Sequence, residues 1–588
     1  MLFSELCKYF EKLEETSSRL SLIDILSDLF KHSSILEIDK IVYLSQGRIA
    51  PFFEATEIGM AEKQVAQAIA QAYGSTKQDV LNLYNKLGDM GQAAVEIHAK
   101  FIEKGKIQHS LFVEKPAKMT VAEVFDVLTQ IAKTNGLGTV EKRQILLSGL
   151  LRKAEDNCLR FLVRIPLGNL RLGVGDPTIL DGLALAKLGD KSKRKLLEGA
   201  YNRTSDLGLI AKAFWDKGLS AVSKLQVIVG KPIRSELCER LPNAEKVIEK
   251  MGIVSAQPKY DGFRVQIHKD GDKIFMFSRN LENMTHMFPE LIEGALKQIK
   301  AKTVILDTEA LAYNPDSEEF LPFQETTKRR RKYGIKEAQK ALPLKAFVFD
   351  ILYKDGKSLI DTPLKERLKI LNDVIEKDDI LIPAKTQEIS DPKKLSLMLE
   401  DSISNGLEGV VIKKIDSAYE AGGRSFNWVK LKRHSDGELQ DTIDCVVLGY
   451  IFGKGKRTAF GAGALLVGVY DDKNDEFVTV SKIGTGLTDE EWREIHKRAD
   501  KIKVSHKPAR INSVVEPSVW IAPRIVIEIL ADEITRSPIH TAGKAKTEPG
   551  YALRFPRLVS FRTADKKPED ATTVKELIEM YNQQGKGK

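Results

Sequence analysis

The chain has 588 residues, of which 42% are hydrophobic and 29% are charged, and its formal net charge is +9. This length corresponds to three or four domains, and the composition excludes a disordered or fibrous chain. No apolar run approaches the ~18 residues that a membrane span needs, and the basic excess does not gather in one tail.

The N-terminal segment predicts a protein that stays inside the cell. Residues 1–15 carry acids where a secretory signal would carry bases and an apolar run. The four cysteines, Cys7, Cys158, Cys238 and Cys445, lie far apart without a C-x-x-C pair. We therefore expect a cytoplasmic location, and neither a disulfide framework nor a Cys-rich zinc site.

Residues 1–225 are predicted to form an all-α domain. Apolar side chains recur there at three- and four-residue steps, from Leu2 to Leu13 and from Leu20 to Phe30. The same spacing runs through residues 121–131 and 145–163. Glycine and proline fall between such stretches rather than inside them, which is typical of helices joined by loops.

Residues 226–433 are predicted to form an α+β domain. Beyond Val229 the apolar residues alternate, and the stretch around Asp270 and Gly271 predicts a hairpin with a tight turn. Further strands are expected at 303–312, 346–352 and 407–413, and helices at 289–299, 363–375 and 393–402. This mixture of strands and helices favours an α+β fold.

Residues 434–588 are predicted to form a small β-barrel of the OB-fold type. Short strands are expected at 442–451, 463–470, 477–483 and 520–529, and a helix at 489–501 interrupts them. Short strands with turn-rich connections are typical of such a barrel. The chain is therefore expected to contain three domains.

The sharpest local signal is the segment Lys259-Tyr260-Asp261-Gly262-Phe263-Arg264, directly before a predicted strand. Further along, Asp307 and Glu309 lie on one face of a buried strand, where carboxylates are costly unless they meet a cation or a ligand. Three more segments follow in order: Phe347 to Tyr353, Glu408 to Lys413, and Arg424 followed by Trp428 to Lys432. Strand alternation points Lys430 and Lys432 the same way, toward a common site.

These residue types suit one kind of chemistry. A lysine amine is a covalent nucleophile once it loses its proton, and nearby positive charge or a metal lowers its pKa. Glu309 and Glu408 are hard oxygen ligands suited to Mg²⁺. The sequence contains no Walker P-loop, no local signature of a serine or cysteine nucleophile, and no metal-ligand spacing among its nine histidines.

In their order and spacing, the five segments resemble the nucleotidyltransferase motif series shared by ATP-dependent DNA ligases, RNA ligases and mRNA capping enzymes. The resemblance implies that Lys259 attacks the α-phosphate of ATP, giving a lysyl-AMP and pyrophosphate. It implies Mg²⁺ held by Glu309 and Glu408, with Mn²⁺ as an expected substitute. It also assigns Arg264 and Arg279 to ribose and nucleic-acid phosphate, Phe349 to the adenine face and Gln257 to the adenine edge. The whole nucleotide-binding set is Gln257, Arg264, Arg279, Glu309, Phe349, Arg424, Lys430 and Lys432.

Segments outside the central domain narrow the resemblance to archaeal ATP-dependent DNA ligases of the replicative type. Arg160 to Arg164 and Gly168 to Asp176 resemble the DNA-binding domain of these ligases. That resemblance implies phosphate contacts at Arg171, Gly173 and Gly175, because glycines let backbone amides approach phosphates. Near the C-terminus, Arg562, Asp565 and Lys566 look like the ligase motif that closes over the triphosphate, with a spacing one residue longer than usual.

The resemblance also implies partners. The expected substrate is nicked double-stranded DNA, joined during replication, recombination and repair, by a protein that is a monomer. The segment Gln108-His109-Ser110-Leu111-Phe112 resembles the peptide by which archaeal ligases dock on a PCNA-like sliding clamp, with Gln108, Leu111 and Phe112 as anchors. The basic run of residues 328–332 is expected on a loop or helix near the DNA.

Two alternatives stay open. An RNA ligase or a capping-type transferase would keep the lysine chemistry and change the substrate. Such enzymes lack a large helical domain before the nucleophile, whereas this chain has one. A non-catalytic DNA-binding scaffold would need degenerate acid and lysine positions, but Glu309, Glu408, Lys430 and Lys432 are all present. The missing zinc cysteines disfavour an NAD-dependent ligase.

Overall fold

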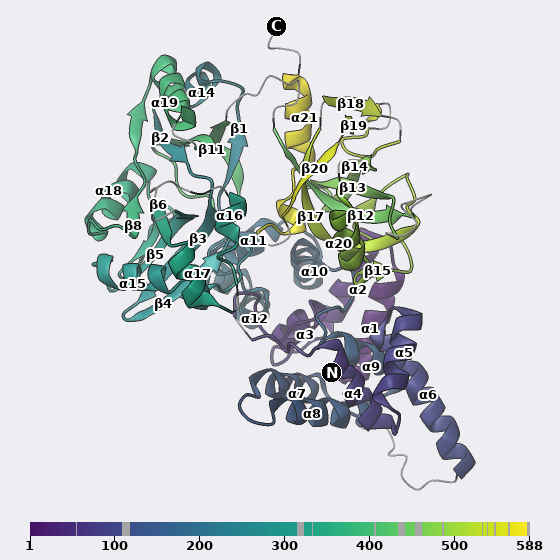
Figure 1. Cartoon of the computed structure of the whole chain (residues 1–588). Helices are drawn as coiled ribbons and strands as arrows, with labels where there is room; N and C mark the ends of the chain where they lie inside the picture. The colour runs from purple at the N-terminus through teal and green to yellow at the C-terminus, as the bar shows by residue number, and fades with distance from the viewer. Residues whose placement is uncertain are drawn as a thin grey trace.

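The computed structural model describes residues 1–584 apart from 55, 109–117, 314–320, 322, 332, 405–406, 433–440, 453–460, 485–486, 532, 538, 546–547, 555 and 563–564. Three regions follow one another along the chain and form three lobes (Figure 1). We call them the helical region (α1 to α13), the two-sheet region (β1 to β11, with α14 to α19 between its strands) and the β-rich region (β12 to α21). No described helix is long and apolar enough to cross a membrane.

The helical region contains the helices that the apolar spacing predicts. They are α1 (Phe3–Glu15), α2 (Arg19–Lys31), α3 (Ile38–Ser45), α4 (Glu62–Tyr73), α5 (Lys77–Leu87), α6 (Met90–Gln108), α7 (Val121–Lys133), α8 (Thr139–Lys153), α9 (Asp156–Arg164), α10 (Asp176–Leu188), α11 (Arg194–Thr204), α12 (Leu207–Lys217) and α13 (Leu219–Ser223). Local chemistry fixes several starts: the Thr120 side chain caps α7 in a capping box with Glu123.

The structure differs from the predicted helices at two places. The apolar period of residues 145–163 is split between α8 and α9, because Ala154 and Glu155 adopt extended backbone. Both helices bury their apolar side in the same core, so the spacing continues across the break and does not reveal it. Leu20, expected on the buried face of α2, is 67% exposed, and Leu22 is buried instead.

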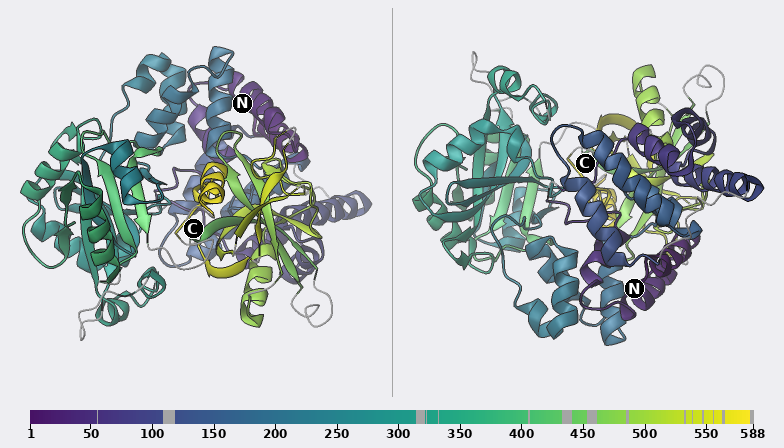
Figure 2. Two further views of the ribbon diagram at one scale, coloured as in Figure 1. Left: turned by 90° about the horizontal axis from the view of Figure 1, so that it is seen from above. Right: turned by 90° about the horizontal axis from the view of Figure 1, so that it is seen from below.

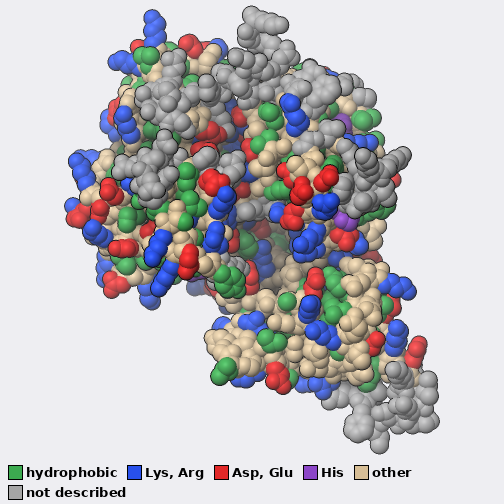
Figure 3. Space-filling model, in the orientation of Figure 1, with side chains coloured by type: hydrophobic (Ala, Val, Ile, Leu, Met, Phe, Trp, Pro, Cys, Tyr) green, Lys and Arg blue, Asp and Glu red, His purple; other side chains and the backbone are tan. Residues whose placement is uncertain are grey.

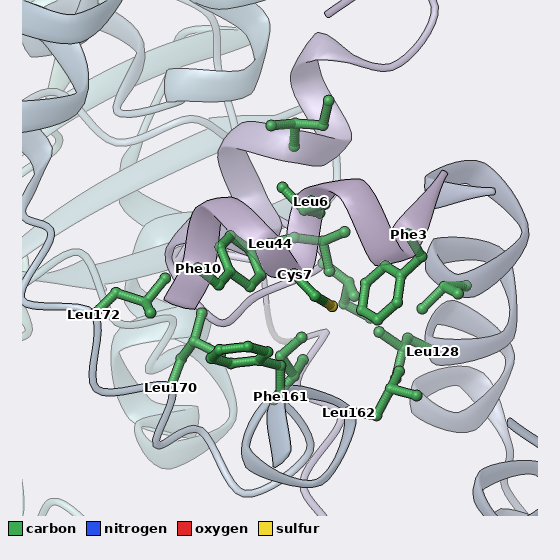
Figure 4. Close-up of a cluster of buried hydrophobic side chains, with 14 of the residues drawn as sticks. Phe3, Leu6, Cys7, Phe10, Leu44, Leu128, Phe161, Leu162, Leu170 and Leu172 are labelled. Carbon is green, nitrogen blue, oxygen red and sulfur yellow. The ribbon is translucent and has the colours of Figure 1, made fainter. Parts of the chain in front are cut away.

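The core of the helical region joins helices that are distant in the sequence. Phe3, Leu6 and Phe10 of α1 lie in one buried cluster with Phe161 and Leu162 of α9 (Figure 4). The rings of Phe10 and Phe161 meet edge to face with centroids 5.4 Å apart. Each such fully buried side chain contributes roughly 1.5–3 kcal/mol of burial free energy. The core therefore holds α1 and α9 in one rigid unit.

The two-sheet region pairs its strands into two sheets. One has the order β1 (Leu237–Arg240), β11 (Arg424–Lys432), β10 (Gly409–Lys414), β2 (Val254–Lys259) and β9 (Gln387–Ile389). The other has the order β4 (Lys273–Ser278), β3 (Phe263–Asp270), β5 (Thr303–Ala312), β6 (Leu344–Lys354) and β7 (Lys357–Ser358), with β8 (Leu381–Pro383) against β6. The helices are α14 (Ala244–Met251), α15 (Pro289–Gln298), α16 (Phe323–Thr327), α17 (Ile335–Ala341), α18 (Leu364–Val374) and α19 (Pro392–Ser404). The predicted α+β character is confirmed.

A buried polar cluster anchors the segment that enters the two-sheet region from the helices. His268 of β3 is fully buried, and its Nδ1 accepts a hydrogen bond of 3.0 Å from the Gly230 N–H. The Gln266 side chain accepts from the Ile233 N–H at 2.8 Å and donates to the Ile233 carbonyl at 3.1 Å. Burial lowers the pKa of His268 to about 3, so this imidazole stays neutral.

This histidine predicts an acid-sensitive fold. The unfolded chain protonates His268 near its ordinary pKa of ~6.5, and the folded chain does not until about pH 3, so stability falls as the pH drops. Between pH 7 and pH 5 the loss from this group amounts to about 2 kcal/mol. In thermal unfolding, a His268→Gln variant should lose less stability over that range than the wild type. Equal losses in both proteins would contradict the expectation.

The β-rich region contains the strands expected after residue 434. One sheet has the order β15 (Lys503–Val504), β17 (Val519–Leu530), β12 (Ile443–Ile451), β13 (Ala464–Asp471), β14 (Glu476–Ile483) and β16 (Ile511–Asn512), with β20 (Arg557–Phe561) against β17. A separate ladder joins β18 (Glu533–Ser537) and β19 (Gly550–Arg554), and α20 (Asp489–Asp500) and α21 (Val574–Gln583) accompany the strands. The predicted β-rich character is confirmed, and assignment to the OB-fold stays a prediction.

The three regions touch one another. α21 lies on the side of the β-rich region that faces the two-sheet region (Figure 2), where Lys575 pairs with Glu239 of β1 at 2.7 Å. The hairpin between β13 and β14 touches the helical region through Asp475, which accepts a hydrogen bond from Thr178. Figure 3 shows a hollow where the three lobes meet. The chain therefore adopts a closed arrangement around that hollow.

Candidate active site

Lys259 is the last residue of β2 and lies at the centre of one sheet. Its partner across β10 is Gly409, which pairs on its other side with Lys432 of β11. Two residues earlier, Gln257 pairs with Val411, which pairs with Lys430. Because paired residues share a face and residues two apart share a face, Gln257, Lys259 and Lys430 are directed to the same side of the sheet. The lysines predicted from separate segments thus meet through strand register, although the Lys432 side chain lies outside the described part.

Two carboxylates accompany Lys259. Glu408 directly precedes β10, its N–H donates to the Lys259 carbonyl at 3.1 Å, and its carboxylate forms an ion pair with the Lys259 amine. Burial raises the pKa of Glu309 to about 7, against the effect of Lys259 and Arg264, while Glu408 and Asp261 raise it further. Two acids crowded beside one amine create a site that attracts an additional cation.

The same contacts decide the protonation of the nucleophile candidate. Burial favours a neutral amine, but the Glu408 carboxylate outweighs it and holds the pKa of Lys259 above its ordinary value, with Glu309 adding to the effect. Lys259 is therefore protonated in this state. Anything that takes Glu408 away from the amine, such as a divalent cation, makes Lys259 more nucleophilic.

The glycine that follows in the same segment is dictated by close approach. A Cβ on Gly262 would lie 2.2 Å from the Ala310 carbonyl oxygen of β5. No other residue fits between Asp261 and β3 without moving one strand. The glycine therefore lets the nucleophile segment pass directly over the strand that carries Glu309.

A polar and aromatic wall lies beside these groups. The Gln257 amide donates to the Thr386 hydroxyl at 3.0 Å and to the Phe349 carbonyl at 3.5 Å. The Lys413 amine donates to the same Phe349 carbonyl at 3.0 Å and lies 3.9 Å from the centre of the Trp428 ring. Burial lowers the pKa of Lys413 to about 8. Gln257 and Phe349, predicted to contact adenine, therefore lie together.

Several residues that the structure places in this wall were assigned no role from the sequence. Lys413 and Trp428 stand in the predicted segments without an assigned role, although a lysine inside a buried strand is itself a signal. Tyr260 stacks on Phe347 with ring centroids 3.9 Å apart and planes at 14°. This stack fixes the backbone next to Lys259 against β6.

Arg264 is held in a dense hydrogen-bond network. Its Nε donates to Asp307 at 2.8 Å, and its Nη2 donates to the other Asp307 oxygen and to the Tyr419 hydroxyl at 3.0 Å. Asp307 is fully buried, so the ion pair is shielded from water. The arginine also lies 5.3 Å from the Phe349 ring centre. It reaches the aromatic wall while Asp307 fixes its orientation.

A second buried ion pair supports the same wall. Asp350 accepts from Arg367 at 2.8 and 3.0 Å, and both side chains are fully buried. Arg367 also donates to the carbonyls of Thr362 and Ser417. Asp350 opposes Asp307 across the β5–β6 ladder, next to a bulge that contains Phe349.

Arg279 and Arg424 lie at the contact with the β-rich region. Arg424 forms an ion pair with Glu576 of α21. Burial alone would raise the pKa of Asp444 and of Asp570, but nearby cations hold both below the ordinary value. Arg279 is one of these cations for each carboxyl. Their assignment to nucleotide binding stays a prediction.

The C-terminal motif makes its contacts within the β-rich region. Arg562 bonds Asp565 at 2.8 Å and lies 3.4 Å from Glu528, and Lys566 forms an ion pair with Asp444. The longer spacing between Arg562 and Asp565 thus allows a local ion pair. These basic groups are occupied by neighbouring acids in this state.

The predicted DNA-binding loop lies under the β-rich region. Arg171 has a φ of +62° and bonds Asp89 at 3.2 Å. The neighbouring Gly168 carbonyl accepts from Arg524 at 3.3 Å. A Cβ on Gly175 would lie 2.9 Å from an Arg510 nitrogen. A cavity of about 950 Å³ separates the rest of the loop from the β-rich region.

Two further predicted features have different outcomes. Leu111 and Phe112 of the clamp peptide lie outside the described residues, and of Gln108 the structure describes only the backbone, at the end of α6.

In the basic run of residues 328–332, Arg329 is fully buried against Glu290, and Arg330 pairs with Glu282 at 2.7 Å. Arg329 and Arg330 are therefore held by acids of their own region.

Three family models match the chain. Residues 235–432 match "ATP dependent DNA ligase domain", residues 2–184 match "DNA ligase N terminus", and residues 458–566 match "ATP dependent DNA ligase C terminal region". A "Probable DNA ligase" of Dictyoglomus turgidum is 47% identical, covering 100% of this chain and 99% of the relative. "DNA ligase 2" of Thermofilum pendens is 43% identical over 99% and 98%, and "DNA ligase" of Saccharolobus solfataricus 41% over 100% and 98%.

Proposed function

The chain belongs to the ATP-dependent DNA ligase family, and on that premise we propose how its residues share the work of joining a nick in duplex DNA. The enzyme is a DNA ligase that uses ATP. One observation carries the residue assignment: Lys259, at the end of β2, lies against Glu408 and close to Glu309.

In the first step, Lys259 is the nucleophile. Its amine attacks the α-phosphorus of ATP, an N–P bond forms, and the bond to the departing pyrophosphate breaks. The amine has to lose its proton first, and the ion pair with Glu408 opposes that loss until Glu408 is drawn away. Lys430 and Lys432 neutralise phosphate charge from the neighbouring strand. Gln257 and Phe349 receive the adenine, and Arg264 the ribose.

The site fits a magnesium ion. Glu309 and Glu408 are carboxylates that act on one another electrostatically, and burial together with the charge of Glu408 raises the pKa of Glu309 to about 7 despite Lys259 and Arg264. Glu309 and Glu408 would hold the ion, and phosphate and water oxygens would fill the rest of its shell. When bound, the ion neutralises phosphate charge and favours a neutral lysine.

In the later steps, AMP passes from Lys259 to the 5′-phosphate at the nick, and the 3′-hydroxyl then displaces AMP. Both transfers need reacting groups held in line, which a protein that surrounds the duplex supplies. We assign residues 1–225 to DNA binding, 226–433 to adenylation and 434–588 to an OB-fold. The ends of α13 and β11 and the starts of β1 and β12 support these limits.

The partners proposed for this ligase are nicked double-stranded DNA and a PCNA-like sliding clamp, with the enzyme acting as a monomer. Arg171, Gly173 and Gly175 are assigned to DNA phosphates. Gln108, Leu111 and Phe112 are assigned to the clamp, on the glutamine-plus-aromatic pattern of the sequence. Replication, recombination and repair are the processes that require such an activity.

Labelling tests the nucleotide assignment. The protein is incubated with ATP, GTP or NAD labelled on the adenylate or guanylate phosphate, and covalent label is measured. We expect label from ATP. Label from GTP or NAD in its place would contradict the proposal. Chasing the labelled protein with nicked DNA or nicked RNA then separates a DNA ligase from an RNA-joining enzyme.

A further inference from the structure

The hairpin between β13 and β14 places an acid of the β-rich region against the helical region. Asp475, at the end of this hairpin, is only 2% exposed. Its Oδ2 accepts from the Thr178 hydroxyl at 3.1 Å and lies 3.5 Å from Nε of Arg19. Its Oδ1 accepts from Tyr470 at 2.8 Å and from Arg510 at 2.5 Å. One carboxylate therefore bridges two regions.

The helical side of this contact is built to hold an anion. Thr178 is buried in the first turn of α10, where the helix dipole favours negative charge. Arg19 of α2 is oriented by Asp181, which it contacts at 2.8 Å. Among the described residues, Arg19 Nε has no hydrogen-bond partner. Arg19 Nε therefore faces Asp475 as an ion pair at 3.5 Å but does not donate a hydrogen bond to it.

Arg510, which donates to Asp475, also lines the cavity between the two regions. Arg48 and Arg524 line this cavity together with Arg171. Burial lowers the pKa of Arg524, and the nearby charges of Arg48 and Arg171 lower it further. In the described part of the chain, neither Arg48 nor Arg524 forms an ion pair with a carboxylate. Glu54, Glu57, Asp89 and Asp176 also line this cavity, so Arg48 and Arg524 form only the part of its wall that favours an anionic ligand.

We propose that Arg19 and Thr178 bind a backbone phosphate of DNA, and that Asp475 occupies this site as a carboxylate surrogate while no DNA is bound. A phosphate presents more acceptor oxygens than the one carboxylate oxygen that faces Arg19. The cavity lined by Arg48, Arg171 and Arg524 adds further positive charge beside this site. A DNA strand carries successive phosphates that can reach both places, whereas a free phosphate ion occupies only one. The inference rests on the proposed function and adds a site outside the loop predicted from sequence.

DNA affinity tests the site. Binding of a nicked duplex by the full chain is measured by fluorescence anisotropy over a range of salt concentrations. Arg19→Gln should weaken binding several-fold and reduce the salt slope by about 1, as expected for one lost phosphate contact. Asp475→Asn should tighten binding several-fold, because a neutral amide competes less well with phosphate. Arg152→Gln, an arginine that bonds Ser148 of its own helix at 3.2 Å, is the charge-matched control.

Several results would overturn the proposal. One is an Arg19→Gln variant whose affinity and salt slope match those of Arg152→Gln. Another is weaker DNA binding by Asp475→Asn in a protein that unfolds at the wild-type temperature. A third is an increase in unfolding temperature with inorganic phosphate that Arg19→Gln abolishes while its DNA affinity is unchanged, because the site would then serve free phosphate. A wild-type protein that takes no label from ATP would instead contradict the proposed function, and this result is independent of the DNA-binding measurements.

Discussion

A Lys259→Ala variant should incorporate no measurable AMP from labelled ATP, whereas the wild type becomes covalently labelled. The reason is direct: the variant lacks the amine that we propose forms the N–P bond, and the neighbouring carboxylates, Glu309 and Glu408, do not replace it. The measurement is the amount of label that stays on the protein in denaturing gel electrophoresis after incubation with α-labelled ATP. The variant should still bind nicked DNA, because that contact lies in other parts of the chain.

A lysine elsewhere in the same region provides the control. Lys297 of α15 is exposed and pairs with Asp378 at 2.6 Å. Lys297→Ala removes the same amine without touching the site, and its labelling should match the wild type. A Lys259→Ala protein that carries wild-type label would place the nucleophile elsewhere and overturn the assignment.

An Asp350→Asn variant should lose about 3–5 kcal/mol of stability, the second large effect expected. The substitution leaves Arg367 buried without a carboxylate, and arginine cannot escape by losing its proton. Lys413, 3.9 Å from Asp350, can do so more easily, because burial has already lowered its pKa to about 8. Thermal unfolding of the full chain measures the effect.

Two further variants separate this cause from a general sensitivity of the region. Asp361→Asn changes an exposed aspartate nearby and should cost little. The double variant Asp350→Leu, Arg367→Met should be more stable than Asp350→Asn, since it removes both charges together. A double variant that is no more stable would show that packing, rather than the unpaired arginine, dominates the loss.

The motif residues illustrate what a sequence can predict. Lys259 and Glu408 lie at strand ends and Glu309 lies within β5, and the rule of alternation brings Lys430 to the face of Lys259. The strands of the β-rich region are short and bounded by turns, so their positions follow from residue pattern alone. These parts depend on neighbours in sequence, which is why they could be predicted.

Other parts depend on how whole regions meet. The ion pair of Arg424 with Glu576 and the cover over Gly175 arise from a rigid-body arrangement that no local pattern encodes. Leu20 shows the same limit within one helix. Its spacing matches the buried face of α2, but the side chain is exposed to solvent, because spacing alone does not show where the packing against other helices ends. The partners of Arg264 depend on the pairing of β3 with β5, which brings Asp307 next to it.

The ion pair between Lys259 and Glu408 has one more consequence. A protonated amine does not react with acyl phosphates, thioesters or other electrophiles that modify exposed lysines. The resting enzyme therefore carries its proposed nucleophile in a protonated, unreactive form until Glu408 is drawn away from the amine. This lysine should be among the last in the chain to be acylated, although we propose that turnover depends on it.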